Sequence, residues 1–133
     1  MVRPSDEESF LFFHLAALQG HADAQLKVAI SYEEGIGARV DPVEACRFYK
    51  MSADQGNSQS QFTYAINLKN GNGVPLDLNE ACRYASLAAE QGHSRAKGWL
   101  GQLYDRFPHL KPTSGNPFFP PDASDVSNQC KLQ

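Results

Sequence analysis

The stretch Ser52-Ala53-Asp54-Gln55-Gly56 recurs along the chain at a fixed interval of 36 residues. It returns downstream as Ala88-Ala89-Glu90-Gln91-Gly92, and upstream it is matched by Ala16-Ala17-Leu18-Gln19-Gly20. A period of about 20 to 50 residues is typical of a solenoid, in which each unit buries its apolar face by stacking on its neighbours. The repeat therefore favours a function that resides in an extended surface.

Each repeat unit reads as two helices joined by a glycine loop. In the first unit, apolar residues spaced four apart predict a helix that ends before Gly35, because glycine readily takes the left-handed cap conformation. A second helix should start after Asp41, a good N-cap residue, with Pro42 in its first turn and Glu44 at the capping-box position. The shift of 36 residues carries this pattern onto the second unit, where Asp77 takes the place of Asp41.

We therefore predict an all-α fold, a short α-solenoid of antiparallel helix pairs over residues 1–104. It comprises a half repeat, two full repeats and a second half repeat, at residues 5–20, 21–56, 57–92 and 93–104. Prolines at 108, 112, 117, 120 and 121, interspersed with small polar residues, predict a disordered tail over residues 105–133.

The repeated residues resemble the Sel-1-like repeat family, which is related to the tetratricopeptide repeats. The resemblance rests on the closing block quoted above, on the Gly-x-Gly loops at 35–37 and 71–73, and on small residues where the two helices should cross: Ala29, Ala65 and Gly101. It implies an adaptor or scaffold protein. We expect a non-enzymatic protein–protein interaction module that binds a helix or peptide of a partner protein.

The resemblance also implies that the first helix of each repeat lines a concave groove. We place the partner contacts on residues of these helices that are spaced by three and four positions: Leu26, Ile30, Glu33, Phe62, Ile66, Lys69 and Gln102. The apolar members can equally form a core shared by successive repeats. The sequence leaves both interpretations open.

The first predicted helix is apolar on nearly all sides around Phe10-Leu11-Phe12-Phe13. Solenoid ends normally present a polar outer face, so something should cover this helix. A partner, a second copy of the chain, or Phe118 and Phe119 of the tail could do so. Alternatively, the chain is a piece of a longer repeat array.

Composition limits the function classes. The net charge is −3 and only 20% of the residues are charged, which argues against a nucleic-acid partner. The first residues are polar and acidic, and no apolar run has the length of a signal or membrane-spanning segment, so we expect a cytoplasmic protein.

Catalytic and metal-binding chemistry is not indicated. Cys46 and Cys82 occupy the same repeat position, about 8–10 Å apart in stacked helices, which is too far for a disulfide. His21 and His93 lie two repeats apart and cannot share a metal. We expect no catalytic residue, no metal, no cofactor and no small-molecule substrate.

The last four residues, Cys130-Lys131-Leu132-Gln133, fit a farnesylation box. This supports an alternative function, a regulatory fragment that is prenylated at Cys130 and associates weakly with membranes. One prenyl chain without basic neighbours anchors weakly and reversibly. Membrane contact is expected only if Cys130 is modified.

Overall fold

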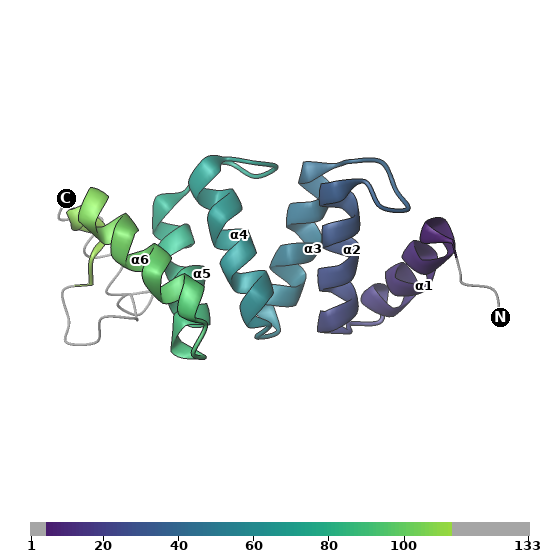
Figure 1. The fold of residues 1–133 in the computed structure, drawn as a ribbon, viewed down its shortest axis with the longest axis horizontal. Helices are drawn as coiled ribbons and strands as arrows, with labels where there is room; N and C mark the ends of the chain where they lie inside the picture. The colour runs from purple at the N-terminus through teal and green to yellow at the C-terminus, as the bar shows by residue number, and fades with distance from the viewer. Residues whose placement is uncertain (1–4, 113–133) are drawn as a thin grey trace.

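A computed structural model describes residues 5–112 of the chain (Figure 1). Over these residues it contains helices and no strand, which confirms the predicted all-α solenoid. The helices are α1 (Asp6–Leu18), α2 (Ala22–Glu34), α3 (Pro42–Asp54), α4 (Ser58–Asn70), α5 (Leu78–Glu90) and α6 (Ser94–Arg106), followed by the short 3-10 helix η1 (Pro108–Leu110).

Helical structure continues past residue 104, where we expected the array to end. Helix α6 ends at Arg106, and η1 packs against both α5 and α6. Pro108 fits here because it occupies the first turn of η1, where no amide hydrogen is needed. Phe118, Phe119 and Cys130 lie outside the described residues.

Capping side chains fix where the helices begin. Asp41 accepts a hydrogen bond from the amide of Glu44 at 3.2 Å, as its position predicts. The Glu44 carboxylate does not close the expected capping box; it accepts from the Arg47 guanidinium instead, at 2.7 Å. Only α1, among the described helices, has a complete box, formed by Ser5 and Glu8.

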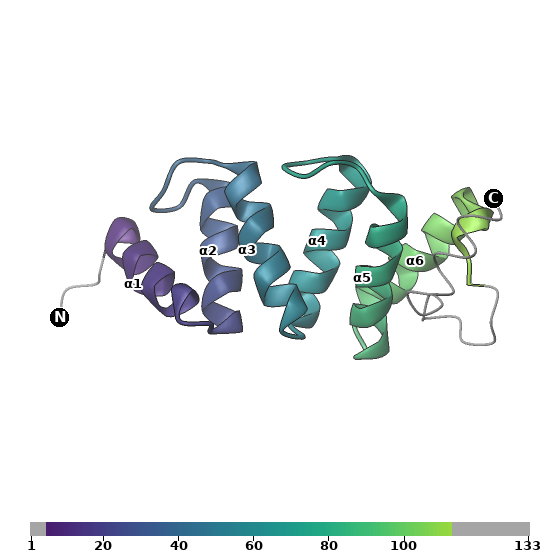
Figure 2. The ribbon, with the colours of Figure 1, turned by 180° about the vertical axis from the view of Figure 1, so that it is seen from behind.

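The helices form a single row in which each packs against the next (Figures 1 and 2). Ala29 and Ala65 are fully buried, as expected where α2 and α4 are crossed by the following helix. Gly101 differs from them: it is exposed, and a side chain there would meet nothing within 4 Å. No described element packs on α6 at this position.

A ladder of glutamines explains the closing block of the repeat. Gln25 and Gln61 are buried, and each donates to a backbone carbonyl eight residues earlier, at 3.1 and 3.2 Å. Each also accepts from the glutamine that closes the next block, Gln55 at 2.7 Å and Gln91 at 2.9 Å. The ladder satisfies buried amide groups and links one repeat to the next.

Candidate protein-binding face

Helices α2, α4 and α6 lie on one side of the row, toward the viewer in Figure 1. The face made by these three helices is called the A face here. Residues related by the shift of 36, such as Glu33 and Lys69, occupy equivalent places on neighbouring helices of this face. The A face is where the predicted partner-binding residues lie.

Phe62 belongs to the core between α4 and α6. Only 4% of its surface is exposed. Its ring lies 5.0 Å from the ring of His93 and 5.9 Å from that of Trp99, measured between centroids, and the Arg95 guanidinium lies 5.7 Å from the Phe62 centroid. Of the two interpretations left open by the sequence, the shared core describes this residue.

The other apolar residues of the predicted set are half-buried. Leu26, Ile30 and Ile66 pack against the core and keep part of their surface accessible. Ile30 lines a cleft between α1 and α2 together with Phe13 and Lys27. Contact of these side chains with a partner stays a prediction.

The polar residues of the predicted set behave differently from one another. Glu33 is exposed, and its carboxylate accepts a hydrogen bond from the Tyr49 hydroxyl at 3.0 Å. Burial and this carboxylate together raise the pKa of Tyr49 well above its ordinary value. Lys69 and Gln102, which come from different helices, meet in one pocket.

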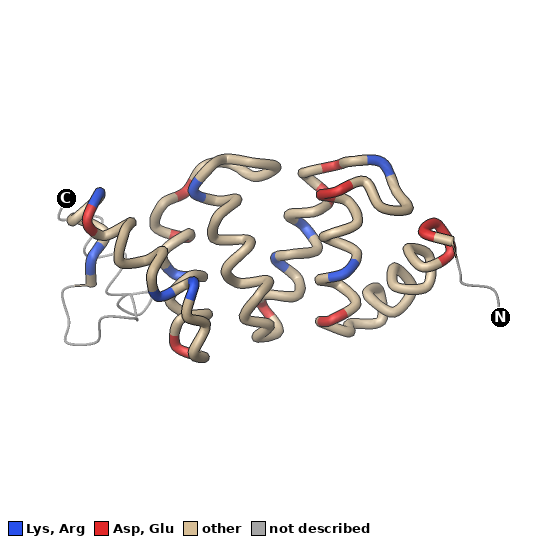
Figure 3. The backbone as a smooth tube through the Cα atoms, viewed as in Figure 1, with Lys and Arg blue, Asp and Glu red and all other residues tan. Residues whose placement is uncertain are grey.

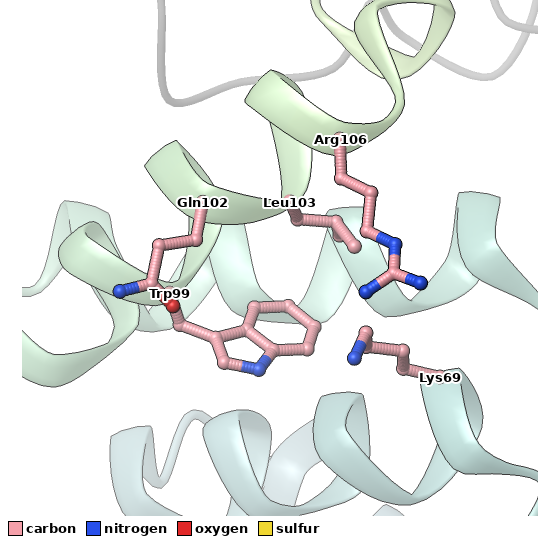
Figure 4. Close-up of a pocket in the computed structure, with 5 residues that line it drawn as sticks. All are labelled: Lys69, Trp99, Gln102, Leu103 and Arg106. Atoms are coloured by element: carbon pink, nitrogen blue, oxygen red, sulfur yellow. The ribbon is translucent and has the colours of Figure 1, made fainter.

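This pocket is a shallow hollow of about 120 Å³ between α4 and α6, and Figure 4 shows the five side chains that line it. Besides Lys69 and Gln102 they are Trp99, Leu103 and Arg106. The side chains of Lys69 and Arg106 converge beside the indole ring of Trp99 (Figure 4). The pocket therefore combines an aromatic surface with two cationic groups.

Sequence reasoning missed Trp99, Leu103 and Arg106. A usable signal was nevertheless present: Trp99 is the only tryptophan of the chain, and the shift of 36 residues pairs it with Thr63. A residue that departs so strongly from its repeat equivalent is a candidate for a role that the other repeats do not have.

The charge around the pocket is positive, although the whole chain carries −3. Asp105 is the single acidic residue of helices α4 and α6. The same two helices carry four basic residues: Lys69, Arg95, Lys97 and Arg106 (Figure 3). Within residues 5–112, no carboxylate forms an ion pair with Lys69 or Arg106. The pocket can therefore accept a carboxylate that has an apolar neighbour.

Comparison with known sequence families and solved structures identifies the family of this chain. The sequence model described as Sel1 repeat matches residues 1–21, 22–57 and 58–93. The chain belongs to the Sel1 repeat family. Proteins with Sel1 repeats are generally protein-interaction modules, and the fold is typically a non-catalytic scaffold.

Two solved structures have similar Sel1 architecture. A protective antigen present in uropathogenic Escherichia coli strains, described as displaying an SLR fold, is 31% identical with a TM-score of 0.75, over 77% of this chain and 22% of the antigen. A Sel1 repeat protein from Oxalobacter formigenes is 26% identical with a TM-score of 0.76, over 98% of this chain and 50% of that protein. The chain thus spans half or less of the length of these structures. A search of curated proteins found no match.

The two cysteines of this Sel1 array are free thiols inside the helices. Burial raises the pKa of Cys82 to about 12, and it also raises the pKa of Cys46, whose thiol donates to the carbonyl of Asn72 at 3.0 Å. Both groups are protonated at neutral pH and poorly suited to act as nucleophiles.

The two histidines considered as metal ligands lie at helix starts. His21 and His93 are the N-cap residues of α2 and α6. Residues 5–112 hold no group of three histidine, cysteine or acidic side chains that could bind a metal. No helix in the same range is long and apolar enough to cross a membrane.

Proposed function

We propose that this Sel1 chain is a non-enzymatic protein-interaction module and that its A face receives a helix or an extended peptide of a partner protein. The observation that carries this proposal is the pocket in which Lys69 and Arg106 converge beside Trp99 without a carboxylate partner among the described residues. An aromatic surface next to arginine is the composition that protein interfaces favour at their energetic centres.

The pocket defines the chemistry of the partner segment. An apolar side chain of that segment would pack on Trp99, and an adjacent carboxylate would lie between Lys69 and Arg106. Exposed ion pairs contribute only about 0–1 kcal/mol each, so the apolar contact supplies most of the affinity. The charges supply specificity and accelerate association.

The half-buried residues of α2 and α4 would extend this contact along the A face. Leu26, Ile30 and Ile66 offer apolar surface beyond the pocket, and Glu33 adds an acidic group at the α2 side. A bound segment that runs from α6 toward α2 would thus meet basic, then apolar, then acidic surface. This order favours a segment with acidic residues at the end that reaches α6.

The decisive variant is Lys69→Glu with Arg106→Glu, which reverses the charge of the pocket. The matched control is Arg39→Glu with Lys50→Glu, which changes the net charge equally at two exposed residues outside the pocket. Peptides selected from a random library on the wild-type chain should be rich in acidic residues next to Leu, Phe or Trp. They should bind the pocket variant at least about tenfold more weakly, which corresponds to about 1.4 kcal/mol.

The same three proteins should then be used to capture partners from the native cell extract. Proteins held by the wild type and the control but lost by the pocket variant support the proposal. Equal capture by the pocket variant and the wild type would contradict it, and so would peptides selected without acidic residues. Circular dichroism must show that all three chains are folded.

A further inference from the structure

The outer side of α1 carries four exposed large apolar side chains, more than any other described helix. Leu11, Phe12, Leu15 and Leu18 are 61%, 70%, 63% and 59% exposed. Phe10 and Phe13, which the sequence grouped with them, pack instead against the core. Helix α1 lies at one end of the row, and no described residue covers its outer side (Figures 1 and 2).

Phe12 by itself fits the packing of its equivalents elsewhere in the array, which a helix on each side covers. The shift of 36 residues pairs it with Phe48, and a second shift pairs it with Tyr84. These two side chains are 0% and 1% exposed, because each lies between the helices that flank it. A helix packed before α1 in the same way would cover Phe12. Leu15 fits the same packing, because its equivalents Met51 and Leu87 are apolar and partly buried against the core.

Leu11 and Leu18 require a different explanation. Leu11 corresponds to Arg47, and Leu18 corresponds to Asp54, both exposed on α3; the equivalents on α5 are likewise charged and exposed, namely Arg83 and Glu90. A preceding helix would therefore leave Leu11 and Leu18 in water. Leu11 and Leu18 thus stand where α3 and α5 carry charge, so a surface that covers them must extend further around α1 than a repeat helix packed before it would.

The spacing of these leucines points to a second copy of α1. Leu11, Leu15 and Leu18 are separated by four and then three residues, the spacing of a helix–helix seam. The stripe is nearly symmetric about Leu15. In an antiparallel pair, Leu11 of one copy meets Leu18 of the other while Leu15 meets its own equivalent, and such self-complementarity is what a twofold interface needs.

Charge selects the antiparallel orientation. The first turn of α1 contains Asp6, Glu7 and Glu8, and its last turn contains no charged residue. A parallel pair would bring the six carboxylates together. An antiparallel pair places the two acidic first turns at opposite ends of the interface, which avoids this repulsion.

We propose that two copies of this chain associate through α1, as an antiparallel helix pair with a twofold axis near Leu15. A single helix from each copy makes a small interface, so we expect a reversible dimer with a Kd on the order of micromolar. The A-face pocket lies between α4 and α6, toward the other end of each chain, and stays accessible in this arrangement. The dimer would then present two pockets to a partner, which increases avidity.

Sedimentation velocity from about 1 µM to about 1 mM tests the proposal on the full chain. The variant Leu11→Arg with Leu18→Asp installs the residues that α3 carries at the same positions, so the helix should tolerate them. The control, Val43→Thr with Leu76→Ser, removes two other exposed apolar side chains. The wild type and the control should dimerise alike, and the α1 variant should dimerise at least about tenfold more weakly.

Cross-linking tests the position of the axis. In a Cys130→Ser background, Leu15→Cys should give a disulfide-linked dimer on mild oxidation, while Lys50→Cys, exposed on α3, should not. A wild-type chain that stays monomeric over the whole concentration range would overturn the proposal. A dimer whose affinity is the same in the α1 variant would also overturn the proposal. Equal cross-linking of the Leu15→Cys and Lys50→Cys variants would do the same. These readouts do not use the pocket and are independent of the proposed partner.

Discussion

At the residue scale, the second glycine of each Gly-x-Gly loop is needed for close approach as well as for its backbone angle. Gly73 has φ +78°, and a side chain there would collide with the backbone carbonyl of Pro42 at the start of α3. Gly37 stands in the same relation to the carbonyl of Asp6 in α1. The loop of one repeat thus rests directly on the helix start of the previous one.

Gly73→Ala should therefore destabilise the fold more than Gly56→Ala does. Both residues have positive φ, which costs an alanine about 1–2 kcal/mol. Gly56 has nothing within 4 Å of the added side chain, whereas Gly73 meets backbone and should lose about 1–3 kcal/mol more through overpacking. Urea denaturation measures both; equal losses would show that the contact between loop and helix is unimportant.

At the scale of single elements, α2 and α6 both have histidine as the N-cap residue, but only the histidine of α6 makes a cap hydrogen bond. His93 accepts from the amide of Ala96 through Nδ1 at 3.2 Å, and its Nε2 lies 3.2 Å from the Gln59 amide oxygen. These two bonds fit a neutral ring with its proton on Nε2. His21 makes no such cap bond at the start of α2.

Substituting the two histidines should therefore affect the stability of the fold to different extents. His93→Ala should lower the free energy of unfolding by about 1 kcal/mol, because α6 loses an N-cap bond and Phe62 loses part of its cover. His21→Ala should change it by less than about 0.5 kcal/mol. Thermal unfolding followed by circular dichroism compares the two; a larger effect at His21 would contradict the assignment.

At the scale of the whole molecule, buried weak acids should make the fold sensitive to alkali. Burial raises the pKa of the Cys46 and Cys82 thiols. It also raises the pKa of all five tyrosines: Tyr32, Tyr49, Tyr64, Tyr84 and Tyr104. For Tyr84 the second cause is its hydrogen bond to the Asp54 carboxylate, at 2.6 Å. Each of these groups favours its neutral form in the folded chain.

The direction of the pH effect follows from these shifts. The unfolded chain ionises near the ordinary values of 9.0 for cysteine and 10.0 for tyrosine, before the folded chain does. The contribution of these groups to stability is therefore fully present below about pH 9 and is lost as the pH rises toward 12, by up to about 1.4 kcal/mol per pH unit for each group. Urea denaturation at pH 7 and at about pH 10.5 measures this loss; equal midpoints would refute it.

Local chemistry explains why so much of the fold was predictable. Helix ends are fixed by residues within a few positions of them, as Asp41 and Gly35 show, and the period of 36 residues identifies the stack without knowledge of any contact. The sequence also indicated that Ala29 and Ala65 would be buried, because small residues recur at the helix crossing. These features need only the chain itself and its period.

The order of helices α1 to α6, the N-cap residue Asp41 and the period that stacks the repeats follow from the sequence alone, whereas the expected capping box at Glu44 does not form. The tertiary structure decided which side chains stay accessible, because exposure depends on neighbours supplied by residues some 30 or more positions away. Packing of α6 on α4 buries Phe62 and forms the pocket of Lys69 and Trp99. The same physics leaves Leu11, Leu15 and Leu18 of α1 facing outward, since α2 packs against the opposite side of α1 among the described helices.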